Sequence, residues 1–175
     1  VFTPEGIAAA LYYALHSTLA TATLFLLVDV VRSRRAGGNL GWEQAPPIVG
    51  GALVAGMFFA AAIAMAGLPP RSGFVGKLLI LDAALADPRM AWVWAVVLTS
   101  SLVAVVGFSR AGSVSFWKAH APVDDPAEAP TVSHGARPMV ASGTLLSASV
   151  LVTGFAGPVY RYLNATAAQL FAPEP

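Results

Sequence analysis

A proline-broken apolar stretch, Gly67 to Leu81 (GLPPRSGFVGKLLIL), constrains the fold of this chain more than any other segment. Proline lacks the backbone donor and clashes with the preceding helical turn, so a helix must be interrupted at Pro69 and Pro70. Irregular backbone at membrane depth survives only where protein buries it or water lines it. The break therefore predicts a cavity within an apolar segment, and it places Lys77 beside that cavity.

The composition is that of an integral membrane protein. Of the 175 residues, 57% are hydrophobic and 11% are charged, whereas a soluble domain carries about 25% charged residues. The net charge of +1, with no basic cluster beyond one three-arginine loop, argues against a nucleic-acid partner. The absence of cysteine excludes disulfides and thiolate chemistry. The sequence starts at Val1 and shows no targeting peptide, so we expect a fragment of a longer chain.

Four apolar segments predict an all-α membrane fold with four transmembrane spans. The first, about 6–31, is long enough to cross a hydrocarbon core of about 30 Å. The second is expected at 47–86, the third at 90–109 and the fourth at 139–160. The polar, proline-containing segment 119–138 is predicted to be a cytoplasmic loop.

The stretch 47–86 has two interpretations, because it is long enough for two short helices that cross twice or for one span broken at 68–72. With one crossing, six loop cations lie on one side of the membrane and two, Arg89 and Arg161, on the other. With two crossings the loop cations divide five to four. The positive-inside rule favours the single broken span, with the cytoplasm before the break. The six cations are Arg32, Arg34, Arg35, Arg110, Lys118 and Arg137.

Lys77 and His16 are the leading candidates for function. An ionisable side chain in the middle of a span costs about 2.5–3.5 kcal/mol on insertion scales and is by default a functional candidate. A buried lysine can alternate between charged and neutral forms, whereas an arginine cannot. An imidazole, which titrates near neutral pH, can relay a proton. We therefore predict that Lys77 passes protons to or from His16 and water in the break.

Three further residues are predicted to support this pair. Thr23 lies seven residues after His16 and shares its helical face, although its hydroxyl can instead bond back to its own helix. Arg71 is expected to cap the carbonyls freed at the end of the first half-helix. Asp82 lies five residues after Lys77, off its face but in the same half-helix, and is interpreted as a structural partner.

Other chemistry is not expected on this chain. The segment 119–138 contains histidines and acids, but their spacing fits no standard ligand pattern, so we favour a solvated loop over a metal site. The chain has no phosphate-binding glycine loop and no Ser/His/Asp arrangement in a plausible frame, so hydrolysis and redox chemistry are not expected. We predict no cofactor and no metal. The loop residues concerned are His120, Asp124, Asp125, Glu128 and His134.

Two motifs, LYYALHSTLATATLFLL followed by AMAGLPPRSGFVGKLLIL, resemble the carboxy-terminal part of the antiporter-like subunits shared by respiratory complex I and the multi-subunit cation/proton antiporters. Within that superfamily, ALHSTLATATLFLL, GFVGK and ATAAQLF most resemble the D subunit of the Mrp (Pha) type. The resemblance implies a fourteen-helix fold with two inverted repeats. The four spans would then be helices eleven to fourteen, and the broken one helix twelve.

The resemblance also implies a function, that of a proton-translocating subunit of a Na⁺(K⁺)/H⁺ antiporter. Such a subunit is a secondary transporter and not an enzyme, and it is a multi-pass protein of the bacterial inner membrane. Lys77 resembles the protonatable residue of the broken helix, and His16 resembles the histidine of the preceding helix. The implied partners are the other subunits of the complex, the lipid bilayer, protons and monovalent cations.

Two alternatives remain. One is an antiporter-like, proton-pumping subunit of complex I or of a related dehydrogenase or hydrogenase. In one type of complex I subunit the position of Lys77 holds a glutamate, which counts against that version. The other is a structural scaffold without a transport role, in which Lys77 stays bonded to freed carbonyls.

Overall fold

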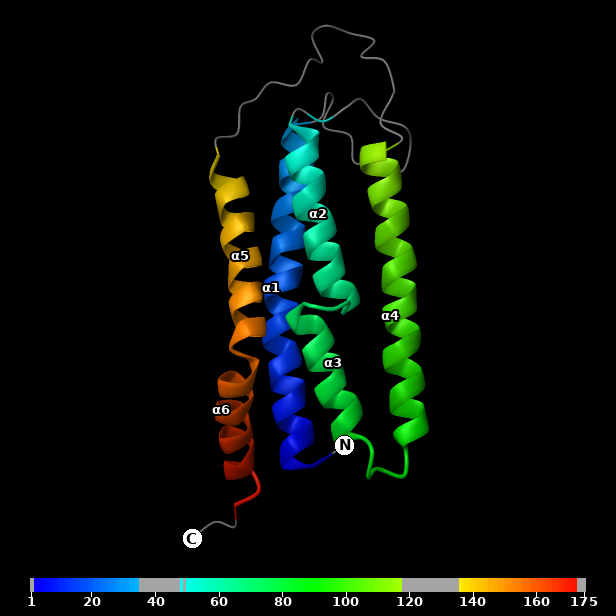
Figure 1. The fold of residues 1–175 in the computed structure, drawn as a ribbon, viewed down its shortest axis with the longest axis vertical. Coiled ribbons are helices and arrows are strands. Elements are labelled where there is room, and N and C mark those ends of the chain that lie inside the picture. Colours follow the sequence, from blue (N-terminus) through cyan, green and yellow to red (C-terminus); the bar gives the residue numbers. More distant parts are fainter. Residues whose placement is uncertain (1, 35–47, 49, 118–135, 173–175) are drawn as a thin grey trace, which may run out of the picture.

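The computed structural model describes residues 2–34, 48, 50–117 and 136–172. Within these ranges the chain is helical and has no strand, so the all-α prediction is confirmed for them. Figure 1 shows the helices running along one long axis. In chain order they are α1 (Pro4–Arg34), α2 (Gly51–Ala66), α3 (Ser72–Ala83), α4 (Met90–Gly112), the π-helical turn η2 (Ser113–Trp117), α5 (Arg137–Gly154) and α6 (Ala156–Gln169).

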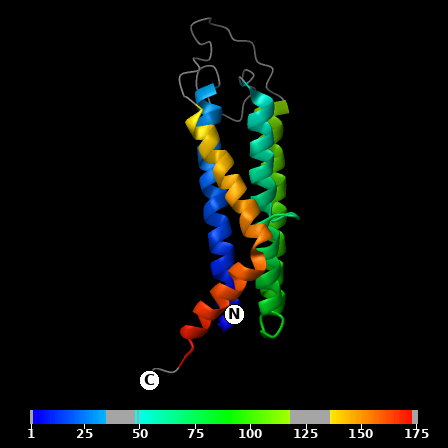
Figure 2. The ribbon, with the colours of Figure 1, turned by 60° about the vertical axis from the view of Figure 1, so that its left-hand side comes forward.

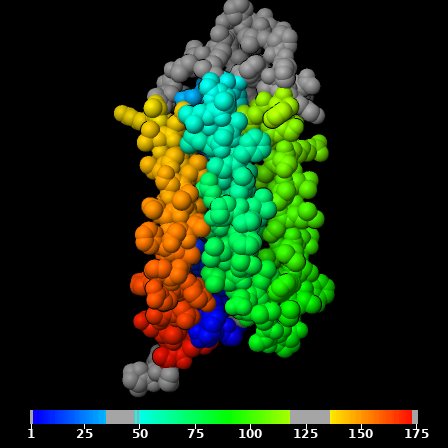
Figure 3. Space-filling view, viewed as in Figure 1, coloured from blue at the N-terminus to red at the C-terminus, as the bar shows by residue number. Residues whose placement is uncertain are grey.

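Helix α1 is the centre of the bundle and packs against α2, α3, α5 and α6. Its buried residues recur every three or four positions, which places them on one face of the helix. In Figure 3, α2 and α3 lie between α4 and the α5–α6 pair and cover much of α1 on that side. The stripe of buried α1 residues includes Ala8, Tyr12, His16, Ala20, Thr23 and Leu27.

Helix α2 ends in a glycine-terminated turn. Gly67 has φ 75°, a left-handed conformation that residues with a side chain rarely adopt. Its N–H donates to the carbonyl of Ala64 at 3.1 Å, and the N–H of Leu68 donates to the carbonyl of Ile63 at 3.1 Å. This pair of bonds is the Schellman motif, which satisfies two of the carbonyls that a helix end leaves open.

Residues 67–71, called the break from here on, separate α2 from α3 halfway along the bundle (Figure 1). The sequence predicted half-helices of about 47–67 and 73–86. In the structure α2 begins at Gly51 and α3 ends at Ala83, so both half-helices are shorter than expected. The two helices follow one another along the long axis and together run beside α4 (Figure 1).

Among the described residues, length and composition identify two helices that can cross a membrane, α1 and the continuous α4–η2. The bent pair of α5 and α6 is a third candidate if it counts as one span. Helix α2 has 16 residues, about 24 Å at 1.5 Å per residue, which is short of a hydrocarbon core of about 30 Å. The broken second span and the fourteen-helix fold therefore stay predictions. The loop predicted at 119–138 lies mostly outside the described residues.

The span expected at 139–160 is divided between two helices, α5 and α6. The axes of α5 and α6 are bent by 78° at Phe155. Pro158 supplies a physical reason, because it has no N–H for the carbonyl of Gly154 and its ring would clash with that carbonyl in a straight helix. Helix α6 runs past the expected end and leaves the bundle obliquely (Figure 2).

Candidate functional site

Lys77 of α3 reaches back across the break to the end of α2. Its Nζ donates to the carbonyl of Ala66 at 2.7 Å and to the hydroxyl of Ser101 at 2.8 Å. Ala66 is the last residue of α2, where the carbonyls lack helical partners and the helix dipole attracts a cation. Ser101 belongs to α4, so Lys77 joins three helices at one point.

Gly67 allows Lys77 to lie this close to the end of α2. A Cβ on Gly67 would come within 2.7 Å of Lys77 Cδ and 2.8 Å of its Nζ. The left-handed backbone favours glycine at this position, and a side chain here would displace the amine end of Lys77 from the end of α2.

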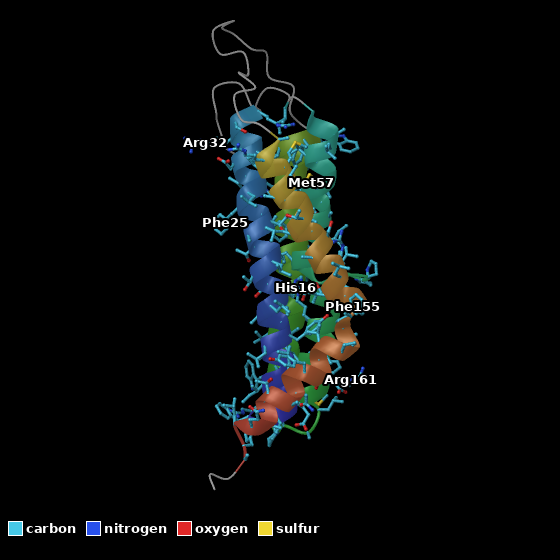
Figure 4. The ribbon with its side chains drawn as sticks, turned by 90° about the vertical axis from the view of Figure 1, so that its left-hand side faces the viewer. His16, Phe25, Arg32, Met57, Phe155 and Arg161 are labelled. Atoms are coloured by element: carbon cyan, nitrogen blue, oxygen red, sulfur yellow. The ribbon has the colours of Figure 1, made fainter. Side chains whose placement is uncertain are left out.

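His16 lies halfway along α1, on the side that faces the other helices (Figure 4). Its side chain is completely buried. Nδ1 shares a hydrogen bond of 2.8 Å with the hydroxyl of Ser72, the first residue of α3. Nε2 is buried and makes no hydrogen bond to any described residue, although the carbonyl of Ala64 lies beside it.

Close contact between α1 and α3 depends on glycine. A Cβ on Gly73 would overlap the carbonyl oxygen of Ala64 and come within 2.6 Å of His16 Nε2. A Cβ on Gly76, one turn later, would lie 3.1 Å from the ring of Tyr13. The GFVGK motif thus brings α3 against α1 and places the imidazole against the end of α2.

His16 and Lys77 therefore meet the same helix end from two helices. His16 lies beside the carbonyl of Ala64, and Lys77 binds the carbonyl of Ala66. The charge of Lys77 acts on His16 electrostatically, and no direct hydrogen bond joins the two among the described contacts. A proton passing between them needs an intervening water or a movement of the lysine.

The α5 side of the site is made of hydroxyl groups. The hydroxyl of Ser149 lies 3.1 Å from that of Ser72, so α5 is linked to His16 through Ser72. One turn away, the hydroxyl of Tyr12 donates to the carbonyl of Val152 at 3.2 Å, just before the α5–α6 bend. Two successive turns of α1 thus make hydrogen bonds to other helices, Tyr12 to α5 and His16 to α3.

The three predicted supporting residues are not joined to this site. Thr23 is buried, but its hydroxyl donates to the carbonyl of Leu19 in its own helix at 2.8 Å. Asp82 is exposed and makes no described ion pair with Lys77. The side chain of Arg71 does not bond the end of α2, where Lys77 takes the capping role, and Arg71 Nη1 is buried without a described partner.

Three serines that hold the candidate pair were not predicted from the sequence, namely Ser72 and Ser149 at His16 and Ser101 at Lys77. Serines in apolar helices most often bond back to their own carbonyls, so their sequence position alone does not mark them. Only Ser72 had a local signal, since it lies inside the PPRSGF motif.

No metal centre is found in the part of the chain that the structure describes, which holds no group of three or more potential ligands of the His, Cys, Asp and Glu types. The histidines and acids of the polar loop at 119–138, which were considered as ligands above, lie outside the described residues.

Comparison with known proteins assigns a family. The family described as "NADH:quinone oxidoreductase/Mrp antiporter, TM" matches residues 1–105. The D subunit of a probable K(+)/H(+) antiporter of Rhizobium meliloti is 32% identical over 95% of this chain and 35% of the relative. The D subunit of the Na(+)/H(+) antiporter of Alkalihalophilus pseudofirmus is 29% identical over 99% of this chain and 34% of the relative.

A further relative comes from the other branch of the family. The N subunit of the NADH-quinone oxidoreductase of Saccharopolyspora erythraea is 33% identical over 62% of this chain and 21% of the relative. The chain spans about a third or less of the length of these relatives. The resemblance inferred from the two motifs is thus confirmed, and the chain belongs to the family of membrane subunits shared by NADH:quinone oxidoreductases and Mrp antiporters.

Proposed function

We propose that this chain is part of a proton-translocating membrane subunit of a multi-subunit Na⁺(K⁺)/H⁺ antiporter, in which Lys77 and His16 relay protons at the break. The named functions of the relatives that are antiporter D subunits support the class of transporter. Its partners are then the other subunits of that complex, protons and monovalent cations, in a bacterial plasma membrane. The excess of positively charged residues in the loops before the break and after the third span supports a cytoplasm on the α2 side of the break.

The position of Lys77 carries this proposal. Its amine binds a carbonyl that α2 leaves open, inside an apolar helical bundle and beside a buried imidazole. An ammonium can give up a proton there and then accept a new one, while the carbonyl and the Ser101 hydroxyl keep the amine in place. Broken helices with groups of this kind are typical of ion and proton sites in transporters.

The test is Lys77→Ala in the full antiporter complex, measured as cation/proton exchange in everted membrane vesicles and expressed per assembled complex. Lys118→Ala is the matched control, because Lys118 is the other lysine of this chain and directly precedes the polar segment 119–138 in the sequence. We expect Lys77→Ala to abolish exchange without loss of assembly and Lys118→Ala to exchange normally. Exchange at the wild-type rate in Lys77→Ala would overturn the relay.

The two hydrogen bonds of Lys77 also favour a second candidate, a structural scaffold in which this lysine serves to hold α2, α3 and α4 together. A structural role predicts that the substitution affects assembly of the complex and not its exchange activity. Lys77→Ala would then reduce the amount of assembled complex on native gels and leave the exchange per assembled complex unchanged.

The relatives that are oxidoreductase N subunits favour a third candidate, a proton-pumping subunit of a quinone-linked oxidoreductase. The neighbouring genes discriminate between the two branches. Genes for small antiporter subunits support the antiporter, whereas genes for flavin and iron–sulfur subunits support the oxidoreductase.

A further inference from the structure

A buried chain of three polar groups connects α1, α3 and α5. It runs from His16 Nδ1 to Ser72 Oγ over 2.8 Å and on to Ser149 Oγ over 3.1 Å. All three side chains are at most 2% exposed. Buried polar groups of this kind are costly unless they are bonded, so the chain fixes the side chains that compose it.

The two nitrogens of the His16 ring face different surroundings. Nδ1 faces the hydroxyl pair, whereas Nε2 faces the end of α2 beside Gly73 and the carbonyl of Ala64. Because the partner of one imidazole nitrogen orients the ring, the hydroxyl pair holds Nε2 toward the end of α2, and the Ser72 hydroxyl can accept from a protonated Nδ1.

Ser149 differs from the other described hydroxyl residues of α5. Each of those donates to a carbonyl of its own helix, whereas the hydroxyl of Ser149 meets a residue of α3. Ser142 is the closest comparison, since it lies two turns earlier on the same face, is equally buried and bonds the carbonyl of Pro138. The other self-bonded hydroxyls of α5 belong to Thr144, Ser147 and Thr153.

We infer that Ser72 and Ser149 are positioning residues that hold His16 by Nδ1 and so make Nε2 the nitrogen that exchanges protons at the end of α2. This inference rests on the proposed function. In the exchange step the imidazolium releases its Nε2 proton to a water or to the neutral Lys77 amine, and the reverse step restores it. Nδ1 keeps its proton, which is donated to Ser72, and no electrons move.

The elements packed against His16 carry several titratable or charged groups, among them Tyr12 one turn earlier on α1, Arg71 directly before Ser72, and Asp82 of α3. Tyr13 of α1 lies with its ring centroid 5.8 Å from that of His16, and Lys77 of α3 acts on it electrostatically. Helix α2 has no titratable residue, and α5 has only Arg137 at its first position. Helix α6 lies beyond the bend, beside the beginning of α1 (Figure 1). Its titratable residues are Tyr160, Arg161 and Tyr162.

The test compares Ser149→Ala with Ser142→Ala in the full complex, by exchange per assembled complex as a function of pH. Hydrogen bonds to a charged group are stronger than those between neutral groups, so removing the Ser149 hydroxyl should destabilise the imidazolium form of His16. We expect exchange to slow about tenfold and its half-maximal pH to move downward by about half a unit or more. Ser72→Ala should do the same. Ser142→Ala should match the wild-type rate and profile, and Ser149→Thr, which keeps a hydroxyl, should keep the wild-type profile.

Each other outcome has a definite meaning. Superimposable profiles for Ser149→Ala, Ser142→Ala and wild type would overturn the inference. So would failure of Ser149→Ala alone to assemble, since that result shows a structural role. His16→Gln separates this inference from the proposed function: wild-type exchange in His16→Gln contradicts the relay itself, whereas slow exchange there with a silent Ser149→Ala contradicts only the positioning role.

Discussion

Lys77 is held by acceptors from two helices, the carbonyl of Ala66 in α2 and the hydroxyl of Ser101 in α4. The hydroxyl of Ser101 donates a hydrogen bond to the carbonyl of Val97 at 2.6 Å, so its oxygen is free to accept a hydrogen bond from Lys77. A protonated amine has three donors, and these two bonds use two of them. At the scale of the residue, the bond from Ser101 is therefore expected to favour the charged form of Lys77.

We predict that Ser101→Ala slows cation/proton exchange by the full complex. A hydrogen bond to a charged group contributes about 1.5–3 kcal/mol, which corresponds to about tenfold or more in an equilibrium between charged and neutral forms. Ser100→Ala is the control, because the Ser100 hydroxyl is exposed and bonds the carbonyl of Val97. Exchange rates per assembled complex that agree for the two variants would contradict this role of Ser101.

The residues of the site differ in how well the sequence revealed them. Lys77 and His16 were found because ionisable groups are rare in apolar helices, so their presence alone is informative. Ser72, Ser101 and Ser149 were missed because their roles depend on which helix they face, which only the packing of α1, α3, α4 and α5 decides. Arg71 was predicted to cap the end of α2 because it is the cation nearest to that end in the sequence. In the structure Lys77, which lies further along α3, reaches back and binds the carbonyl of Ala66 instead.

At the scale of the elements, two interrupted helices flank α1. The first interruption was predictable because Pro69 and Pro70 follow a glycine, a combination that stops a helix. The second, at Phe155, was not predicted because Pro158 lies in a segment rich in small residues that suits packing as well as bending. Side chains of α1 contact both interruptions, His16 at the first and Tyr12 near the second.

Pro158→Ala should straighten the α5–α6 bend, because alanine at this position would offer an N–H to the carbonyl of Gly154. The measurement is the distance between spin labels at Val140 and Tyr162, two exposed positions on α5 and α6. We expect that distance to increase. Pro138→Ala is the control, since Pro138 lies in the first turn of α5, where proline is tolerated. Equal distances in both variants would show that Pro158 does not cause the bend.

The turn between α3 and α4 should be sensitive to acid. Asp87 accepts the N–H of Arg89 at 2.7 Å, and this bond holds the pKa of the Asp87 carboxyl below its usual value. A lowered folded-state pKa gives stability that is present above the unfolded pKa of about 3.9 and is lost as pH falls through the folded value.

We therefore expect wild type to melt at a higher temperature than Asp87→Asn at pH 7 and to lose that advantage as the pH falls through the lowered pKa of the Asp87 carboxyl. Thermal unfolding of the purified full-length protein, measured from pH 7 into the acid range, gives the difference. An advantage that grows on acidification would contradict this assignment.

At the scale of the whole molecule, α1 organises the bundle and α4 forms its margin. The most apolar window of α4 has no buried residue, so in a membrane its outer surface meets lipid or other helices. Hydropathy predicted where the long helices lie because apolar length is a local property of sequence. That His16 and Lys77 act together was inferred from their rarity and from family resemblance. Their meeting at the end of α2 was not predicted, since contacts between distant segments have no local signature.

The central claim is that Lys77 must release its proton, and Lys77→Arg tests it most directly. Arginine keeps a permanent positive charge and can still donate to the carbonyl of Ala66, but it cannot deprotonate in a working transporter. The measurement is cation/proton exchange in vesicles by a complex whose assembly is verified on native gels. The relay predicts normal assembly with exchange lost; wild-type exchange by assembled Lys77→Arg would contradict it.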